Sequence, residues 1–482
     1  MSIRRPTPTT TVSGGARAPE GGPAGTGAPA RRRAGTHAGG PTDPSHDEEL
    51  RRGIIHTAIS RRVAFLLVVP FALSIVGVPV AQAVRDKIAG DESVLLDLFR
   101  HAPTKANIDQ FEEELNKAST PREWIRPRLQ ALFVRYGGFG NIKAVVGRDG
   151  WLFYAPGATA VGGPGFLDRE ILAVRRKAAL DAGDAQAFPD PRPAVVDFAK
   201  YLAGRGIKLV LFPVPDKVSL QPYQLHGRAA GAAGAPPRNP DADRFAAEMR
   251  AAGVIVFDPT PAQLDPGAPP RFLRQDTHWT PAWMESVADT LAATLVREGA
   301  LAAASRPREW RVADLSVSRV GDVTDMLGLP EGQTLFAPDT ITVHQVRDAS
   351  GTAFEPVAES EVLLLGDSFT NVFSLDQMGW GEAAGFGPHL ARALGRDVDV
   401  IAQNDSGAFA TRQLLANALG EAKDEGSGAV GAPARDRLSG KKVVIWELAS
   451  RELAVGNWKP IAWPGAPAPG ARPASHDGSA PR

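Results

Sequence analysis

Residues 361–370 read EVLLLGDSFT, and an apolar run there leads directly into Gly366-Asp367-Ser368. A continuous run of branched apolar residues is typical of a strand that is buried on both faces of a parallel sheet. Ser368 follows this predicted strand at its carboxyl end, where ligands bind in open α/β sheets. Its hydroxyl is therefore a candidate nucleophile, with backbone N–H groups of the following turn available to an oxyanion. The alternative is that Ser368 only caps the next helix.

The same strand pattern recurs on both sides of this stretch and alternates with amphipathic helical segments. This alternation predicts a doubly wound α/β fold, in which about five parallel strands are covered by helices on both faces. The predicted strands are IKLVLFPV (207–214), VIVFD (254–258), EVLLLG (361–366), VDVIAQN (398–404) and KKVVIWEL (441–448). The predicted helices lie at 193–206, 241–253, 281–299, 389–395 and 411–419. An Asp-Gly pair at 149–150 predicts a hairpin within 141–154, and residues 155–190 read as loop-rich.

An uncharged apolar run at 63–84 is long enough to span a bilayer as a helix. Arginine pairs at 51–52 and 61–62 precede it, whereas basic and acidic residues are interleaved after it. The positive-inside rule therefore predicts a cytoplasmic N-terminus and a periplasmic or cell-surface location for the rest of the chain. The alternatives are a buried core helix and a cleaved signal peptide, because 81–83 resembles a signal-peptidase site. The long arm before the run favours an uncleaved anchor.

These patterns divide the chain into five predicted parts. Residues 1–60 are rich in Gly, Pro, Thr and Arg and predict a disordered cytoplasmic arm, and 464–482 predict a similar tail. Between them we expect the membrane anchor at 63–84, a helical stalk at 85–140 and the α/β domain at 141–463. Helical patterns in the stalk cover VLLDLFR at 94–100 and residues 107–115.

Composition excludes several classes of function. The 54 basic and 54 acidic residues balance, so charge gives no reason to expect a nucleic-acid partner. The absence of cysteine excludes disulfides, thiolate catalysis and zinc–thiolate sites.

A serine nucleophile needs a base, and one segment upstream supplies a good candidate. In RQDTHWTPAW, Asp276 and His278 are two residues apart, so in an extended segment their side chains point the same way. Thr280 and Pro281 suit the cap and first position of the helix that follows. This arrangement favours a base with its acidic orienter. The alternative is an Asp–His pair that only ties down the loop. No further metal ligand stands nearby at a usable spacing, so we expect no metal.

His389 is the chief rival as a base. It falls in GFGPHLARALG, at the first turn of a predicted helix, where a capping or surface role fits better. His226 and His344 have no acidic neighbour at a comparable spacing.

A strand that ends in GDSF, together with a separate acid–histidine pair, resembles the SGNH/GDSL hydrolase superfamily. Ordinary members carry the histidine block after the serine, whereas here Asp-x-His precedes it by about ninety residues. That permuted order is similar to the AlgX/AlgJ type of SGNH-like proteins, which is related to alginate O-acetyltransferases. The likeness covers most of residues 140–455. It is carried by GRDGWLFY (147–154), RGIKLVLFPVPDK (205–217), DTHWT (276–280), GDVTDMLGLP (321–330), LLLGDSF (363–369) and VVIWELASREL (443–453).

The resemblance implies a triad of Ser368, His278 and Asp276, in which the serine takes an acetyl group as an ester and passes it to a sugar hydroxyl. It implies a membrane-anchored, extracytoplasmic O-acetyltransferase that acts on a polysaccharide or cell-envelope glycan. A multi-pass membrane acyltransferase would deliver the acetyl group, and no cofactor is implied. The alternatives are a carbohydrate acetyl esterase with the same triad and a non-catalytic glycan-binding component of a polysaccharide export machine.

The oxyanion and substrate-binding groups are less clearly marked. The superfamily's asparagine block has no clean copy, and QNDSG at 403–407 is the nearest match. For Glu447 and Arg451 the alternative role is a surface salt bridge. Trp279 and Trp446 could stack on a sugar ring, but packing in the core is the commoner role of such tryptophans. The predicted oxyanion and substrate-binding residues are Asp367, Phe369, Asn404, Gly407, Trp279, Glu447 and Arg451.

Overall fold

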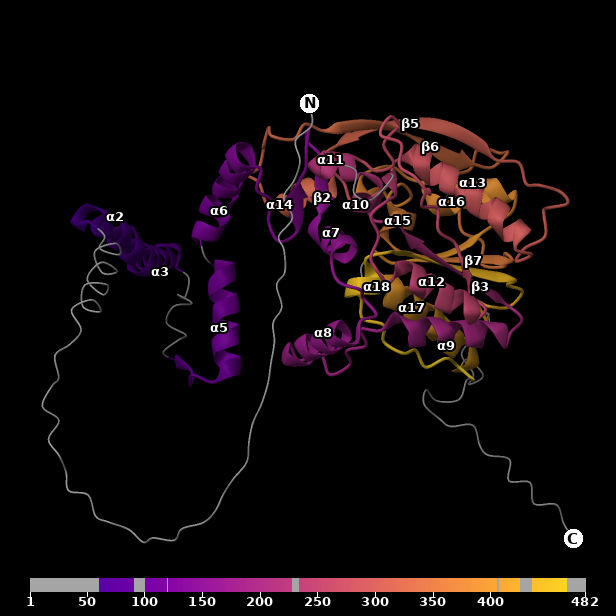
Figure 1. Cartoon of the computed structure of the whole chain (residues 1–482), viewed down its shortest axis with the longest axis horizontal. Helices are drawn as coiled ribbons and strands as arrows, with labels where there is room; N and C mark the ends of the chain where they lie inside the picture. Colours follow the sequence, from indigo (N-terminus) through magenta and orange to yellow (C-terminus); the bar gives the residue numbers. More distant parts are fainter. Residues whose placement is uncertain are drawn as a thin grey trace, which may run out of the picture. The chain divides into compact units, whose positions relative to one another are not determined.

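The computed structural model describes residues 60–90, 100–118, 120–227, 234–404, 407–424 and 436–465 (Figure 1). The chain divides into two units, Met1–Ser93 and Val94–Arg482. In the first, α2 (Arg61–Ala72), a π-helical turn and α3 (Val78–Ala89) form one continuous helix of 29 residues. Its length and apolar composition are sufficient to cross a membrane, and it contains the run predicted at 63–84. The predicted arm before residue 60, the tail beyond 465 and most of VLLDLFR lie outside the described residues.

A five-stranded parallel sheet forms the centre of the second unit, with strand order β4-β3-β9-β7-β8. All five predicted strands are present, and the predicted α/β class is confirmed. The last strand of the chain, β9, lies between β3 and β7, so the carboxyl ends of these three strands are neighbours. The strands are β3 (Lys208–Val214), β4 (Ile255–Val256), β7 (Val362–Gly366), β8 (Asp399–Ala402) and β9 (Val443–Ala449).

Helices cover both faces of this sheet (Figure 1). Successive strand residues point to opposite faces, so Leu364 and Ile445 belong to one apolar cluster, whereas Leu363 and Trp446 belong to the other. The first cluster includes α13 (Pro281–Arg297) and α16 (Phe386–Leu394). The second includes α9 (Pro191–Ala203), α12 (Ala242–Ala251) and α17 (Gly407–Asp424). The fold is therefore doubly wound, as predicted.

Two antiparallel pairs flank the sheet. The predicted hairpin is confirmed as β1 (Ala144–Val146) and β2 (Leu152–Tyr154). The strands are joined by residues 147–151, within which the Trp151 N–H donates to the Arg148 carbonyl over 2.9 Å. The two central residues of that turn have positive φ, 52° at Asp149 and 78° at Gly150, as a type I′ turn requires. The second pair, β5 (Arg311–Arg319) and β6 (Asp339–Arg347), was not predicted.

Two helices occupy the region that we expected to be loop-rich, so that expectation is wrong. They are α7 (Ala155–Gly162) and α8 (Arg169–Asp181). Helix α7 was missed because its small residues give no apolar periodicity. Helix α8 begins after Asp168, whose side chain accepts hydrogen bonds from the backbone of the first turn. The predicted helical stalk contains α5 (Lys105–Ala118) and α6 (Thr120–Leu132), followed by the π-helical turn η3 (Phe133–Gly137).

Candidate active site

Ser368 opens the short helix α15 (Ser368–Asn371) directly after β7. Residues 362–370 are buried except for Ser368, which is half-buried. The helix cap is Asp367, whose carboxylate accepts a hydrogen bond of 2.8 Å from the Phe369 N–H. The alternative of Ser368 as the cap is therefore wrong. A Cβ on Gly366 would lie 2.1 Å from Thr370 Oγ1, which explains the glycine before this tight turn.

The fold brings His278 and Asp276 to this serine. His278 Nε2 lies 2.8 Å from Ser368 Oγ, and His278 Nδ1 lies 2.6 Å from Asp276 Oδ1. The histidine and aspartate are buried, and the ring of His278 packs edge-on against Phe369. Since Nδ1 faces a carboxylate, the neutral ring carries its proton there and presents Nε2 to the serine as an acceptor. This is the geometry that a serine nucleophile and its base require.

Asp276 accepts further hydrogen bonds that hold it ionised. The His278 backbone N–H donates to Oδ1 over 3.0 Å, while Trp380 Nε1 and the Asp322 N–H donate to Oδ2 over 2.9 and 3.0 Å. Burial alone would raise the pKa of Asp276, but the charge of His278 and these hydrogen bonds hold that pKa below its usual range. Burial likewise opposes protonation of His278, yet the charge of Asp276 raises the pKa of the imidazole.

Asp322 is a second acid beside the histidine, at the start of α14 (Asp322–Leu327). Its Oδ2 lies 4.0 Å from His278 Nδ1, and its Oδ1 accepts from Thr277 N and Oγ1. Burial and the charge of Asp276 raise its pKa to about 6. Asp276, His278 and Asp322 lie close enough together to hold a metal ion. However, both imidazole nitrogens already have partners, Asp276 and Ser368, so binding would break the hydrogen-bonded chain to the serine.

Lys217, at the start of α10 (Lys217–Leu220) after β3, fixes the loop that carries the acid and the histidine. This buried side chain donates to the backbone carbonyls of Leu152 and Leu273, each over 2.6 Å, and of Arg274 and Asp276, each over 3.0 Å. One ammonium group therefore ties the hairpin strand β2 to the Asp276 segment.

The profile of the family described as "SGNH hydrolase-like domain, acetyltransferase AlgX" matches residues 144–424, more than half of the chain. The chain belongs to this AlgX family. A stretch of 159 residues is 33% identical to the "Probable alginate O-acetylase AlgJ" of Pseudomonas aeruginosa and covers 32% of this chain and 34% of that protein. The chain thus spans about a third of the length of this curated relative.

Two solved structures are also similar to this AlgX-family chain. The "O-Acetyltransferase Domain of Pseudomonas putida AlgJ" has 23% identity and a TM-score of 0.45, with 65% of this chain and 93% of that chain covered. Pseudomonas aeruginosa AlgX has 16% identity and a TM-score of 0.40, with 65% of this chain and 66% of that chain covered.

Most of the predicted substrate contacts in this AlgX-family chain turn out to be buried. Trp279 is fully buried and packs edge-on against Phe369. Its assignment as a sugar-stacking residue is therefore wrong, and the core packing weighed against it is confirmed. Phe369 itself is 1% exposed and belongs to the same apolar cluster. The sequence could not separate a core tryptophan from a stacking platform, because both stand next to the histidine.

Glu447 and Asp367 lie beneath the serine rather than in an open cleft, which corrects their assignment as substrate contacts. Glu447 Oε2 accepts from the Asp367 N–H over 3.0 Å and from Thr370 Oγ1 over 2.7 Å. Asp367 Oδ2 in turn accepts from the Ala449 N–H over 2.7 Å. Burial, with the charge of Asp367, raises the pKa of Glu447 well above its usual range. The Glu447 side chain therefore fastens the turn of Ser368 to β9.

Three of the predicted residues remain near the sheet edge. Asn404 is exposed, and its Oδ1 accepts a hydrogen bond of 2.8 Å from Asn371 at the end of α15. Gly407 begins α17, while the two residues before it lie outside the described part of the chain. Arg451, which follows β9, lies over the rings of Tyr154 and Phe369.

His389 is not the histidine that contacts Ser368, because Ser368 Oγ faces His278 and the His389 ring has a different partner. It is 1% exposed, and its Nε2 bonds the backbone carbonyl of His344 over 2.9 Å. The expected capping or surface role is therefore wrong. Burial lowers the pKa of His389 to about 4. His344, which has no acidic neighbour at a comparable spacing in the sequence, pairs through Nδ1 with Glu285, 59 residues earlier, over 2.6 Å.

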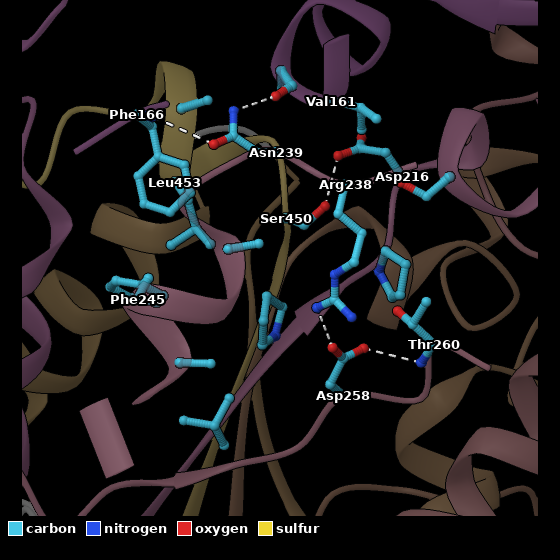
Figure 2. Close-up of a pocket in the computed structure, with 18 residues that line it drawn as sticks. Val161, Phe166, Asp216, Arg238, Asn239, Phe245, Asp258, Thr260, Ser450 and Leu453 are labelled. Carbon is cyan, nitrogen blue, oxygen red and sulfur yellow. Dashed lines mark hydrogen bonds and ion pairs between the residues drawn. The ribbon is translucent and has the colours of Figure 1, made fainter. Parts of the chain in front are cut away.

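A pocket lies at the carboxyl ends of β3, β4 and β9, on the same edge of the sheet as Ser368 (Figure 2). In its wall, Ser450 Oγ donates to the buried carboxylate of Asp216 over 2.6 Å. Arg238 and Asp258, both in the lining of this pocket, form an ion pair. Burial raises the pKa of Asp216 to about 6 in spite of Arg451, whose Nη1 lies 3.8 Å away.

Proposed function

We propose that this protein is a membrane-anchored, extracytoplasmic O-acetyltransferase that modifies hydroxyl groups of a polysaccharide or cell-envelope glycan. The observation that carries the proposal is the hydrogen-bonded chain from Ser368 Oγ through His278 to Asp276, in a domain of the AlgX family. The relative named an alginate O-acetylase supports the acetyl group as the cargo. The glycan itself is left open.

In the first half-reaction, Ser368 Oγ attacks the carbonyl carbon of an acetyl donor while His278 Nε2 takes the hydroxyl proton. The proton then passes to the donor's leaving group, and the acetyl group remains on the serine as an ester. In the second half-reaction, a sugar hydroxyl gives its proton to Nε2 and attacks the ester, and Ser368 leaves with that proton. Asp276 stabilises the imidazolium in both halves.

The developing oxyanion needs donors close to Ser368. We assign this role to the Ser368 backbone N–H and to the side-chain amide of Asn404, which reaches α15 through Asn371. Arg451, with only 13% of its side chain exposed, is positioned beside Phe369 to contact the substrate at the edge of the site.

The anchor in this proposal is the helix Arg61–Ala89. The stalk at 85–140 would then connect the anchor to the acyltransferase domain at 141–463 outside the cytoplasm. Activated acetyl groups are made inside the cell, so a multi-pass membrane acyltransferase would have to deliver the group to Ser368.

The test uses the full chain in detergent or nanodiscs with a chromogenic acetyl ester, with and without neutral and uronic-acid oligosaccharides. We expect an acetylated Ser368 peptide by mass spectrometry and acetyl transfer to at least one acceptor. Ser368→Ala should abolish both, whereas Ser316→Ala, at an exposed serine of β5, should change neither. Acetyl release without transfer to any acceptor would identify an esterase instead. The absence of any acyl-serine would overturn the enzymatic proposal altogether.

A further inference from the structure

The helix α6 and the turn η3 expose an unusual number of large apolar side chains. Tyr136 is 78% exposed, Phe133 54% and Leu132 50%, values that are typical of charged surface residues. Exposed apolar patches of this kind mark interaction surfaces. The apolar face, as we call it, consists of Ile125, Leu129, Leu132, Phe133, Tyr136 and the following Phe139.

The exposed residues lie on one side of the helix, and the opposite side already faces protein. Along α6 and η3, the apolar face recurs every three to four residues, which is the spacing of a single helical stripe. The other side contains the half-buried Gln130 and the buried Val134, which joins an apolar cluster with Ala144 and Leu152. Gln130 Nε2 also donates to the Phe139 carbonyl over 3.2 Å. The helix therefore packs against the protein through its other side, and the apolar face remains exposed.

The basic residues around the apolar face indicate what kind of partner covers it. Residues 124–143 contain Arg126, Arg128, Arg135 and Lys143 but no acidic residue, a net charge of +4. The Arg128 guanidinium lies 4.3 Å from the ring centre of Trp124. Aromatic and apolar residues flanked by arginines are the composition of helices that lie in a membrane interface, where cations meet lipid phosphates.

The position of this segment in the chain points to the same partner. Trp124 follows the end of the apolar helix Arg61–Ala89 by 35 residues, so an inserted anchor would tether α6 close to the bilayer. We propose that α6 and η3 lie flat on the extracytoplasmic surface of an anionic lipid bilayer. The apolar face is inserted at the headgroup–acyl boundary, and the arginines contact phosphates. This inference rests on the membrane anchor of the proposed function. The inference goes beyond the proposed function because it adds a second membrane contact, made by α6 and η3, to the contact made by the anchor helix.

The absence of cysteine makes the test direct. Leu129→Cys and Phe133→Cys, each labelled with a polarity-sensitive fluorophore, are prepared in the full chain and reconstituted into nanodiscs of phosphatidylcholine with or without phosphatidylglycerol. Val312→Cys, at an exposed valine of β5, is the matched control. We expect blue-shifted emission from labels at 129 and 133, with at least twofold quenching by lipids that carry a quencher just below the headgroup. The label at 312 should be unaffected.

Each other outcome rejects the inference in a recognisable way. If the chain co-elutes with nanodiscs but the labels at 129 and 133 stay as water-exposed as the control, the anchor stands and the surface contact is wrong. If the chain does not co-elute with nanodiscs, both the membrane anchor and the surface contact are rejected. The proposed reaction at Ser368 is tested independently, by the search for an acetylated Ser368 peptide. Protection of position 129 only after a membrane protein is added would identify a protein partner instead. Quenching at 129 and 133 should be stronger in nanodiscs with phosphatidylglycerol than in those without it. Combining Arg126→Gln with Arg128→Gln should remove most of this difference between the two kinds of nanodisc. A difference as large as in the parent would contradict the role given to charge.

Discussion

Ser368 and His278 are 90 residues apart in the chain, yet Oγ of the serine lies 2.8 Å from Nε2 of the histidine. The two residues belong to different segments, and a different buried side chain holds each segment in place. The serine stands on a turn fastened to β9 by Glu447, whereas the histidine stands on a loop fastened by Lys217. Because Glu447 and Lys217 are both buried, the alignment of the serine with the histidine depends on residues in the interior of the domain.

Asp276→Asn should leave the fold intact and reduce kcat/KM by roughly 10³- to 10⁴-fold. An amide nitrogen facing Nδ1 would favour the tautomer that carries its proton on Nε2, which could not accept the Ser368 proton. The measurement is ester turnover together with the melting temperature. Asp325→Asn, at an exposed acid of α14, is the control and should retain full activity. Activity within tenfold of the parent would contradict the orienting role of Asp276.

The pH profile should have an acid limb set by His278. Only the neutral imidazole can take the serine proton, and the charge of Asp276 raises its pKa above the ordinary 6.5 in spite of burial. Activity should therefore rise with pH through a midpoint above 6.5. The charge of Asp322 also raises the pKa of His278, so Asp322→Asn should move that midpoint to lower pH while the triad stays complete. A midpoint that stays in place would show that Asp322 does not act on the base.

Much of the fold and the proposed triad could be predicted because their signals are local. Strand β7 is an unbroken apolar run, and Asp276 stands two residues from His278, so both follow from short-range patterns. The ribbon β5–β6 was missed although alternating apolar and polar residues such as Leu315, Ser316 and Val317 were present. An alternating pattern predicts a strand less clearly than an unbroken apolar run does, and β5–β6 alternates because one face of the ribbon is exposed.

The supporting residues could not be predicted, since their roles arise from contacts between distant segments. Asp322 donates its backbone N–H to an acid 46 residues earlier, and Lys217 binds a carbonyl 59 residues later. Nothing around either residue in the sequence specifies those partners. Burial also escaped prediction for Glu447, because a strand end can face either the core or the cleft. The sequence therefore predicts the cluster of Ser368, His278 and Asp276 better than the buried residues that align it.

Lys217→Met should destabilise the domain and impair the base together. The substitution keeps an apolar stem of similar length. It leaves four backbone carbonyls, three of them in buried hydrogen bonds, without their common donor, which costs about 2–4 kcal/mol of unfolding free energy. Because Asp276 belongs to the released loop, kcat should fall even at temperatures where the variant is folded. Lys208→Met is the matched control, since this exposed lysine donates to a single carbonyl, that of Gly299. Equal melting temperatures for the two variants would refute the clamp.

Glu447→Gln should preserve activity and change how stability depends on pH. A glutamine resembles the protonated acid and can still accept from the Asp367 N–H and the Thr370 hydroxyl. Glu447→Ala leaves both donors unpaired beneath Ser368, so it should lose about 2–4 kcal/mol of stability and most of the activity. Glu355→Gln, at an exposed position, serves as the control.

The pH dependence follows from the raised pKa of Glu447. Above its ordinary value of 4.5, the unfolded chain releases this proton while the folded chain retains it, so the wild-type protein loses stability as pH rises towards the folded pKa. The glutamine variant has no proton to lose. Its stability relative to wild type should therefore increase with pH, by up to about 1.4 kcal/mol per pH unit. Chemical denaturation at pH 5, 6.5 and 8 measures this difference, and parallel stability curves for the two proteins would mean that Glu447 is ionised in the fold.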